Sequence, residues 1–351
     1  MNKQHRMNSN YIKTVLILSL TALSFTACNV FNSDTENIEW GDWARISSYE
    51  GIPRSNAVAF SIDGKGYVGT GYNGDQDDDQ DRLKDIWEFD PEMNFWTQKA
   101  DFPGIPRNSA VAFVADGKGY VGTGYNDDVD GYYLRDFWAY DPATNSWDSV
   151  AAFGGSARYG AVAFALNNKG YVGTGHDDND LKDFWRYDPE TDQWAQVVSI
   201  PGEKRIDATA FVIDDKAYVG TGTSNGIYEP DFWVYNPESG LWSNLQNLDE
   251  DRDENSRDIP RSKAVSFTLD GKGYIALGYS GGNKSNIWQY NPETDVWTDE
   301  DLAVFEGNAR RDAVAFTINN LAYVGTGNNG SLYYDDFWEY NPNIENDEDS
   351  Y

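Results

Sequence analysis

The chain has 351 residues, with 58 acidic against 27 basic side chains and a formal net charge of −31. This balance excludes nucleic-acid binding, because no basic stripe is present to replace the counterions of phosphate. The single cysteine excludes an intrachain disulfide and a cysteine-based zinc site.

The N-terminal segment predicts export. Three basic residues precede an apolar run, residues 15–27, that is too short to span a bilayer as a mature helix. The run ends in Phe-Thr-Ala-Cys, which resembles a bacterial lipoprotein cleavage site, and the resemblance implies removal of residues 1–27 and lipidation of Cys28. An ordinary secretory signal followed by a chance cysteine is the alternative. Residues 28–39 are polar and predict a flexible tether after the acylated cysteine.

From Trp40 onward the sequence repeats about every fifty residues. One copy contains an arginine followed by a small apolar strand, then Tyr-Val-Gly-Thr-Gly, then a tryptophan before an Asp-Pro turn, and a closing tryptophan. In the first copy these elements are Arg54 to Phe60, Tyr67 to Gly71, Trp87 and Trp96. Short strand-like pieces at this period predict an all-β fold, a β-propeller, with six blades over residues 40–344 and an acidic tail at 345–351.

The sixth copy lacks its last strand, because no tryptophan follows Asn341-Pro342 at the usual spacing. An isolated segment, Trp40 to Ile46, stands before the first repeat. We predict that this N-terminal strand completes the last blade with Trp43 as its closing tryptophan, which leaves no free sheet edge.

The order of these elements resembles the kelch repeat, and the likeness covers about Trp40 to Asn343. Kelch propellers include partner-binding modules, sugar oxidases and a sialic-acid mutarotase, so the resemblance implies the fold and leaves the activity open. The copper chemistry of the oxidases needs two histidines and a cysteine–tyrosine crosslink. Here the only histidines are His5 and His176, and the only cysteine is Cys28, which excludes that chemistry.

Each repeat carries one arginine, for which two roles are open. The arginines either form a cationic ring that faces an acidic ligand, or they pair within each blade with an aspartate before the third-strand tryptophan. Their recurrence in all six copies favours the structural pairing. The aspartates are Asp85, Asp136, Asp183, Asp231 and Asp336.

Function in a repeat protein is best sought where the copies differ. The kelch resemblance implies ligand contacts from loops on one face, just after the first-strand arginine and just after the glycine pair. Aromatic rings among short polar side chains suit a sugar or a peptide, although ordinary polar loop tips have the same composition. The candidate ligand-binding residues are Tyr72, Asn73, Tyr125, Asn126, Tyr159, His176, Tyr279 and Asn328.

The loops that follow the glycine pairs are rich in acidic residues. Asp127, Asp128 and Asp130 form a candidate calcium site, because Ca²⁺ takes six to eight oxygen ligands. The spacing is not that of an EF-hand loop, and solvated acidic loops are the alternative. No other cofactor is predicted.

The sequence therefore predicts a monomeric, non-catalytic binding module, anchored by lipid in the cell envelope as an outer-membrane lipoprotein. Its loop face is expected to bind a glycan or a protein segment. The first alternative is a sugar mutarotase or epimerase with a carboxylate base, for which Glu50, Glu229 and Glu306 are candidates. The second is a structural scaffold in an envelope complex.

Overall fold

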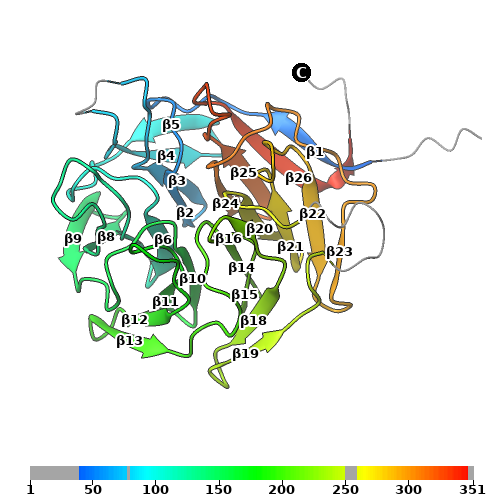
Figure 1. Ribbon diagram of the computed structural model, residues 1–351. Helices are drawn as coiled ribbons and strands as arrows, with labels where there is room; N and C mark the ends of the chain where they lie inside the picture. Colours follow the sequence, from blue (N-terminus) through cyan, green and yellow to red (C-terminus); the bar gives the residue numbers. More distant parts are fainter. Residues whose placement is uncertain (1–38, 77–79, 250–258, 347–351) are drawn as a thin grey trace, which may run out of the picture. The chain divides into compact units, whose positions relative to one another are not determined.

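The computed structural model describes residues 39–76, 80–249 and 259–346, and all of these belong to one compact unit, residues 38–351. The described residues are built from β-strands (Figure 1). No helix long and apolar enough to cross a membrane occurs among them. The predicted signal segment, Cys28 and most of the tether lie outside the described residues, as does most of the acidic tail.

Six four-stranded antiparallel sheets form the blades of a propeller. Blade one contains β2 (Val58–Ile62), β3 (Lys65–Gly69), β4 (Ile86–Asp90) and β5 (Phe95–Gln98). Blade two contains β6 (Val111–Ala115), β7 (Lys118–Gly122), β8 (Phe137–Asp141) and β9 (Ser146–Val150). Blade three contains β10 (Val162–Leu166), β11 (Lys169–Gly173), β12 (Phe184–Asp188) and β13 (Gln193–Val197).

The second half repeats the pattern. Blade four contains β14 (Thr209–Ile213), β15 (Lys216–Gly220), β18 (Phe232–Asn236) and β19 (Leu241–Asn244), with a small extra hairpin of β16 (Thr223–Ser224) and β17 (Ile227–Tyr228). Blade five contains β20 (Val265–Leu269), β21 (Lys272–Ala276), β22 (Ile287–Asn291) and β23 (Val296–Thr298). Blade six contains β24 (Val314–Ile318), β25 (Leu321–Gly325), β26 (Phe337–Glu345) and β1 (Trp40–Arg45).

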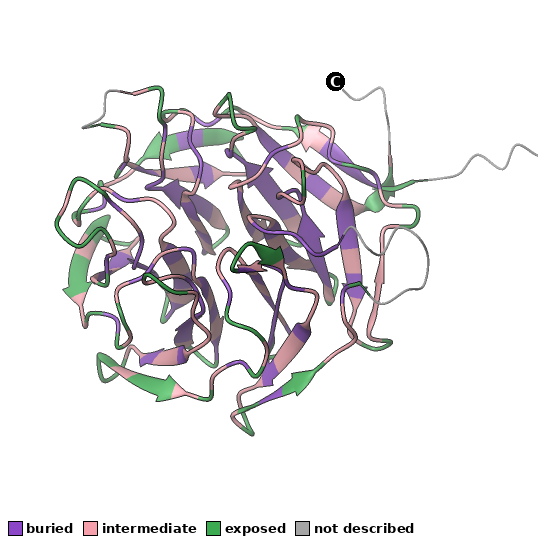
Figure 2. Ribbon diagram, in the orientation of Figure 1, coloured by how far each residue is buried: buried purple, intermediate pink, exposed green. Residues whose placement is uncertain are grey.

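The first strands of the six blades surround a central channel. Each contacts the first strand of both neighbouring blades, so that β2, β6, β10, β14, β20 and β24 form a closed ring. Buried residues concentrate on these inner strands and between the blades, whereas exposed residues lie on the outer strands and loops (Figure 2). Alternating buried positions along each first strand, as in Val58, Phe60 and Ile62, place the core between adjacent blades.

The sixth blade is closed by the N-terminal strand, as the sequence predicted. β1 pairs with β26, and Trp43 lies opposite Tyr340. Trp96 and Trp147 hold the same register in their own blades, opposite Phe89 and Tyr140. Trp43 is fully buried, and its indole nitrogen donates a hydrogen bond to the carbonyl oxygen of Ala303 in the connection that leaves blade five. One blade therefore contains both ends of the described chain.

The repeated arginines pair within their blades, which confirms the structural interpretation. The fully buried Arg54 makes two hydrogen bonds of 2.7 Å to the carboxylate of Asp85, which also accepts from the indole nitrogen of Trp87. Burial opposes ionisation of Asp85, but the Arg54 hydrogen bonds and charge hold its pKa below the ordinary value. The other blades repeat this pairing, except that Asn286 replaces the aspartate beside Arg261.

Candidate functional site

The two sets of loop residues singled out in the sequence lie side by side on one end of the propeller, here called the loop face. In blades one to three the residue after the first-strand arginine bridges the residue after the glycine pair: Ser55 with Tyr72, Asn108 with Tyr125, and Tyr159 with His176. Blades four to six repeat this bridge. The opposite end of each blade carries the tight hairpins, such as the turn at Asp63, which has a positive φ of 50°.

A ring of backbone hydrogen bonds surrounds the mouth of the channel on the loop face. Six residues, one per blade, each donate their N–H to the carbonyl oxygen of the preceding blade's residue at 2.9–3.1 Å. All six have positive φ, between 50° and 60°. This channel mouth consists of Asn56, Ser109, Gly160, Asp207, Lys263 and Asp312. The ring fixes the inner ends of all six loops relative to one another.

The single cation of the channel mouth, Lys263, lies between two carboxylates. The ammonium of Lys263 lies 3.4 Å from the carboxylate of Asp312 and 4.0 Å from that of Asp207. Burial raises the pKa of Asp207 to about 6, the charge of Lys263 opposes this shift, and the charge of Asp312 adds to it. The mouth therefore presents no unpaired cation to an acidic ligand.

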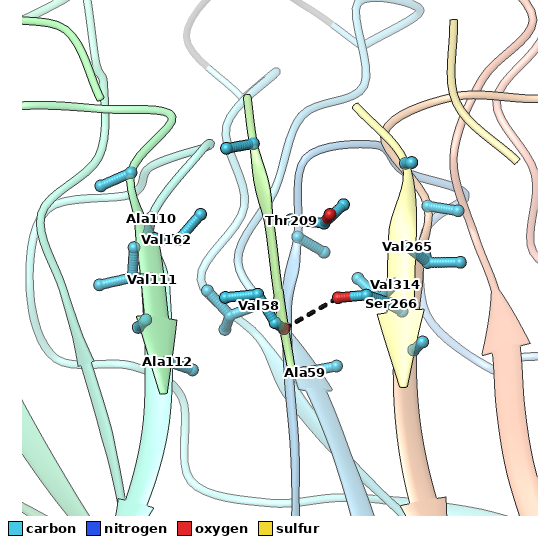
Figure 3. A pocket seen from close by; sticks show the side chains of 18 residues that line it. Val58, Ala59, Ala110, Val111, Ala112, Val162, Thr209, Val265, Ser266 and Val314 are labelled. Atoms are coloured by element: carbon cyan, nitrogen blue, oxygen red, sulfur yellow. Dashed lines mark hydrogen bonds between the residues drawn. The ribbon is translucent and has the colours of Figure 1, made fainter. Parts of the chain in front are cut away.

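Below the mouth, the channel itself has a cavity of about 200 Å³ lined by the first strands. Small side chains such as Ala57 and Ala59 lie here. Figure 3 shows these residues and the hydrogen bond that the hydroxyl of Ser266 donates to the carbonyl oxygen of Ala210. The lining is uniform and lacks charged groups, so the channel offers little to distinguish one ligand from another.

Aromatic rings gather on the loop face over blades two and three. Tyr125 lies 5.4 Å from Tyr159, which lies 5.5 Å from His176. Tyr133 stacks on Tyr159 at 5.6 Å with an interplanar angle of 21°. Burial, followed by the nearby charge of Asp207, raises the pKa of Tyr159, so its hydroxyl stays protonated. Sequence reasoning missed Tyr133, although the Tyr132-Tyr133 pair in a loop is itself an aromatic signal.

Arg82 joins the loops of blades one and two. Its guanidinium lies 5.4 Å from the ring centres of both Tyr72 and Tyr125 and pairs with the carboxylates of Asp81 and Asp127. The side chain is only 7% exposed. Because two carboxylates and two rings already surround it, Arg82 orders the aromatic residues and is not itself available to an anion. No repeat signal marks this arginine, since it occurs in one copy.

A cavity of about 360 Å³ lies between the loops of blades three and four. Blade three supplies an aromatic wall and acidic groups, and blade four supplies the opposite wall, including the hairpin β16–β17. We call it the inter-blade cavity. It is lined by Tyr159, His176, Asp178, Asn179, Asp180, Lys204, Ile206, Asn225 and Gly226.

The hairpin is held against blade three by a hydrogen bond of 2.7 Å from the backbone N–H of Asn225 to a carboxylate oxygen of Asp180. Asn225 and Gly226 both have positive φ, as the Asn-Gly dipeptide of a two-residue β-turn requires. That dipeptide is the sequence signal that would have predicted this wall of the cavity.

His176 is oriented by a carboxylate within the inter-blade cavity. Its Nδ1 lies 2.9 Å from the other oxygen of Asp180, and its side chain is 26% exposed. With Nδ1 as the donor, a neutral imidazole directs an unprotonated Nε2 away from Asp180. A histidine in this setting can accept a hydrogen bond from a ligand hydroxyl or transfer a proton.

Four further predicted ligand-binding residues do not line the inter-blade cavity. Asn73 and Asn126 are buried, and their amides bond to the carbonyl oxygens of Pro53 and Pro106 while accepting a backbone N–H from their own loops. Their side chains are therefore used to stabilise the conformation of their own loops. Tyr279 and Asn328 lie on the loop face of blades five and six, beside Arg311 and Asp312 respectively, and do not line the inter-blade cavity.

The aspartates predicted to bind calcium do not form a metal site, and the glutamates considered as a catalytic base do not lie in the inter-blade cavity. Among the described residues no three His, Cys, Asp or Glu side chains converge to hold a metal ion. Asp127 pairs with Arg82, while Asp128 and Asp130 are exposed, so the calcium prediction gains no assembled ligand set. None of Glu50, Glu229 and Glu306 lines the inter-blade cavity.

Comparison with known proteins supports this architecture. A family model described as the KLHDC2/KLHL20/DRC7 Kelch-repeats domain matches residues 24–175, and a model of the kelch motif matches residues 157–201. The chain is a six-bladed kelch-repeat propeller. A solved structure titled "Structure of YjhT" aligns with 83% of this kelch propeller and 96% of its own chain, with a TM-score of 0.67 and 17% identity, which shows the shared fold alone.

Sequence relatives of the kelch propeller are matched over a short segment. N-acetylneuraminate epimerases of Escherichia coli (strain K12) and Shigella sonnei (strain Ss046) are each 37% identical to it over 86 residues. That segment is 24% of this chain and 23% of those proteins, so the chain matches about a quarter of their length. The match extends the family likeness without assigning their activity to this protein.

Proposed function

We propose that this kelch propeller is a carbohydrate-binding module and that a sugar binds in the inter-blade cavity. The observation that carries the proposal is the combination of a cavity of about 360 Å³ with an aromatic wall at Tyr159 and an oriented histidine at His176. Pockets of about this volume suit small ligands, and neither the channel cavity nor the channel mouth has an aromatic wall.

The chemistry of the lining favours a sugar over a peptide segment. The face of a tyrosine ring packs against the C–H groups of a pyranose and loses little side-chain entropy on binding. Carboxylate, amide and imidazole groups around it accept and donate hydrogen bonds to hydroxyl groups. A bound protein segment would instead need an extended groove across several blades.

The proposed cellular setting follows from the N-terminal sequence. Lipidation at Cys28 would anchor the propeller to the cell envelope, with residues 29–39 as a spacer that lets the loop face reach soluble or surface glycans. Mass spectrometry of membrane-extracted protein tests this part: an acylated Cys28 is expected, and an unmodified N-terminus elsewhere contradicts it.

Sugar mutarotation is the second candidate function, and the His176–Asp180 pair is the observation that favours it. An imidazole held by a carboxylate is suited to moving a proton between the anomeric oxygen and the ring oxygen of a sugar. This candidate places the acid–base group on His176 instead of on a glutamate. The partial likeness to N-acetylneuraminate epimerases adds support.

Saturation-transfer NMR on residues 29–351 tests the proposal and separates the two functions. These residues contain the whole compact unit. The probes are glucose, galactose, glucosamine, N-acetylglucosamine and N-acetylneuraminate. Binding without faster anomer exchange supports the module, whereas faster exchange that His176→Gln abolishes supports the mutarotase. Absence of transfer to every sugar contradicts both functions.

A further inference from the structure

The lining of the inter-blade cavity contains more acidic than basic side chains. Two carboxylates, of Asp178 and Asp180, line it, and Lys204 at its rim is the only lysine or arginine in the described lining. Two other cations of the loop face are already paired, Arg82 with Asp81 and Asp127, and Lys263 with Asp207 and Asp312.

The two carboxylates differ in how far their oxygens are already used. Asp180 is 11% exposed, and both of its oxygens are engaged, one with His176 and the other with the backbone of Asn225. Asp178 is exposed, and one of its oxygens accepts a hydrogen bond of 3.2 Å from the hydroxyl of Tyr133. Asp178 therefore keeps acceptor capacity for a ligand at the lip of the cavity.

We infer that the inter-blade cavity selects an amino sugar, a hexose that carries a primary ammonium group, with the ammonium at Asp178 and one ring face on Tyr159. This inference rests on the proposed carbohydrate binding and adds the class of sugar.

The hydrogen-bonding groups of the ligand and the cavity are complementary in this arrangement. Hydroxyl and ammonium groups supply donors, while Asp178 and, in its neutral form, Nε2 of His176 supply acceptors. A carboxylated sugar would bring acceptors and a negative charge to the same lip, where Asp178 and Asp180 would repel it. The exposed ammonium of Lys204 is the only cation of the described lining that would attract it. The cavity thus differs in selectivity from what the name of the matched epimerases suggests for those proteins.

Isothermal titration of residues 29–351 with glucosamine, N-acetylglucosamine and N-acetylneuraminate tests the inference near neutral pH. Glucosamine is expected to bind about tenfold more tightly than N-acetylglucosamine, which has the same ring without the charge. N-acetylneuraminate is expected to bind most weakly. Raising the salt concentration should reduce the preference for glucosamine, because screening weakens a partly exposed charge pair.

Two matched variants assign the preference to Asp178. Asp178→Asn should bring glucosamine and N-acetylglucosamine to within about twofold of each other, whereas Asp177→Asn, the same change on the neighbouring residue outside the cavity lining, should leave the preference intact. Lys204→Gln should strengthen glucosamine binding.

Equal or tighter binding of N-acetylglucosamine or N-acetylneuraminate by the parent overturns the amino-sugar inference but leaves carbohydrate binding standing. So does a preference that survives Asp178→Asn. Absence of binding by all three sugars overturns the amino-sugar inference as well, and it also counts against the proposed function.

Discussion

Trp43 of β1 lies opposite Tyr340 of β26, with ring centres 4.6 Å apart, although the two residues come from opposite ends of the chain. The indole also packs edge-on against Phe305 at 4.9 Å. This pairing joins the first described strand to the last and closes the sixth blade. The stability of the whole ring therefore depends on a short N-terminal segment.

Replacing Trp43 with alanine is expected to destabilise the propeller by about 3–5 kcal/mol, since it removes a fully buried aromatic side chain at the closure. Trp40→Ala is the matched control. Trp40 lies in the same strand but is 48% exposed, so its loss should cost under about 1 kcal/mol. Chemical denaturation measures both, and equal stabilities of the two variants would show that closure does not depend on Trp43.

The buried arginines allow a comparison that the chain itself supplies. Arg107→Met should cost about 3–5 kcal/mol, because it removes the four hydrogen bonds of a fully buried guanidinium, including both bonds to Asp136. Asp136→Asn should cost clearly less, because an asparagine oxygen can still accept a hydrogen bond from the guanidinium, as Asn286 does from Arg261. If thermal melting shows the asparagine variant to be the less stable, the carboxylate contributes more than this account allows.

Asp207 should make the stability of the folded protein depend on pH. Its folded-state pKa of about 6 lies above the ordinary value of 3.8, so the folded protein binds an extra proton between these values and loses stability as the pH rises through that window. Asp207→Asn lacks this titration. The free energy of unfolding of the variant, relative to that of the parent, should therefore rise by about 2 kcal/mol between roughly pH 4.5 and pH 7.5.

Denaturation of the parent and of Asp207→Asn at several pH values measures that difference. A difference that is flat across the window, or that moves in the favour of the parent as the pH rises, would show that Asp207 ionises normally beside Lys263.

Arg82 is expected to order the aromatic loops without contributing much to global stability. Arg82→Gln removes the contacts with Tyr72 and Tyr125 and the ion pair to Asp127, so amide hydrogen exchange in residues 80–84 and 125–134 should accelerate. Lys84→Gln, an exposed change in the same loop, should leave exchange unchanged. Unaltered exchange in the Arg82 variant would remove this residue from the account of the site.

The sequence predicted the six-bladed scaffold better than it predicted the candidate binding site. Trp43 and the arginines could be placed because the arginines recur in every blade and Trp43 completes an evident gap in a repeat. Arg82 and Tyr133 do not recur in every blade, so no periodicity marks them, and their importance arises from contacts between the loops of different blades. Asn73 and Asn126 shared the composition of a binding loop, but their amides are used by the loop backbone itself, which only coordinates reveal.

The inter-blade cavity was missed for a related reason. It exists because blade four carries the extra hairpin β16–β17 and because Asn225 bonds to Asp180 across the gap between blades. The loop that forms this hairpin is as long as its counterpart in blade six, so a repeat alignment does not mark it and cannot show which neighbouring loop it meets. His176, in contrast, was singled out by residue type, and the structure adds the carboxylate that orients it.

The central claim, that a sugar occupies the inter-blade cavity, is tested most directly by following one resonance. His176 is the sole histidine in residues 29–351, so the Cε1–H signal of its ring gives a single peak in a ¹H–¹³C spectrum. Titration with glucosamine should shift that peak saturably. Tyr159→Ala should weaken the apparent affinity for glucosamine by about fivefold to tenfold. Phe95→Ala, at the opposite end of blade one, should leave this affinity unchanged. A histidine peak that stays fixed while saturation transfer reports bound sugar would place the site elsewhere and contradict the account.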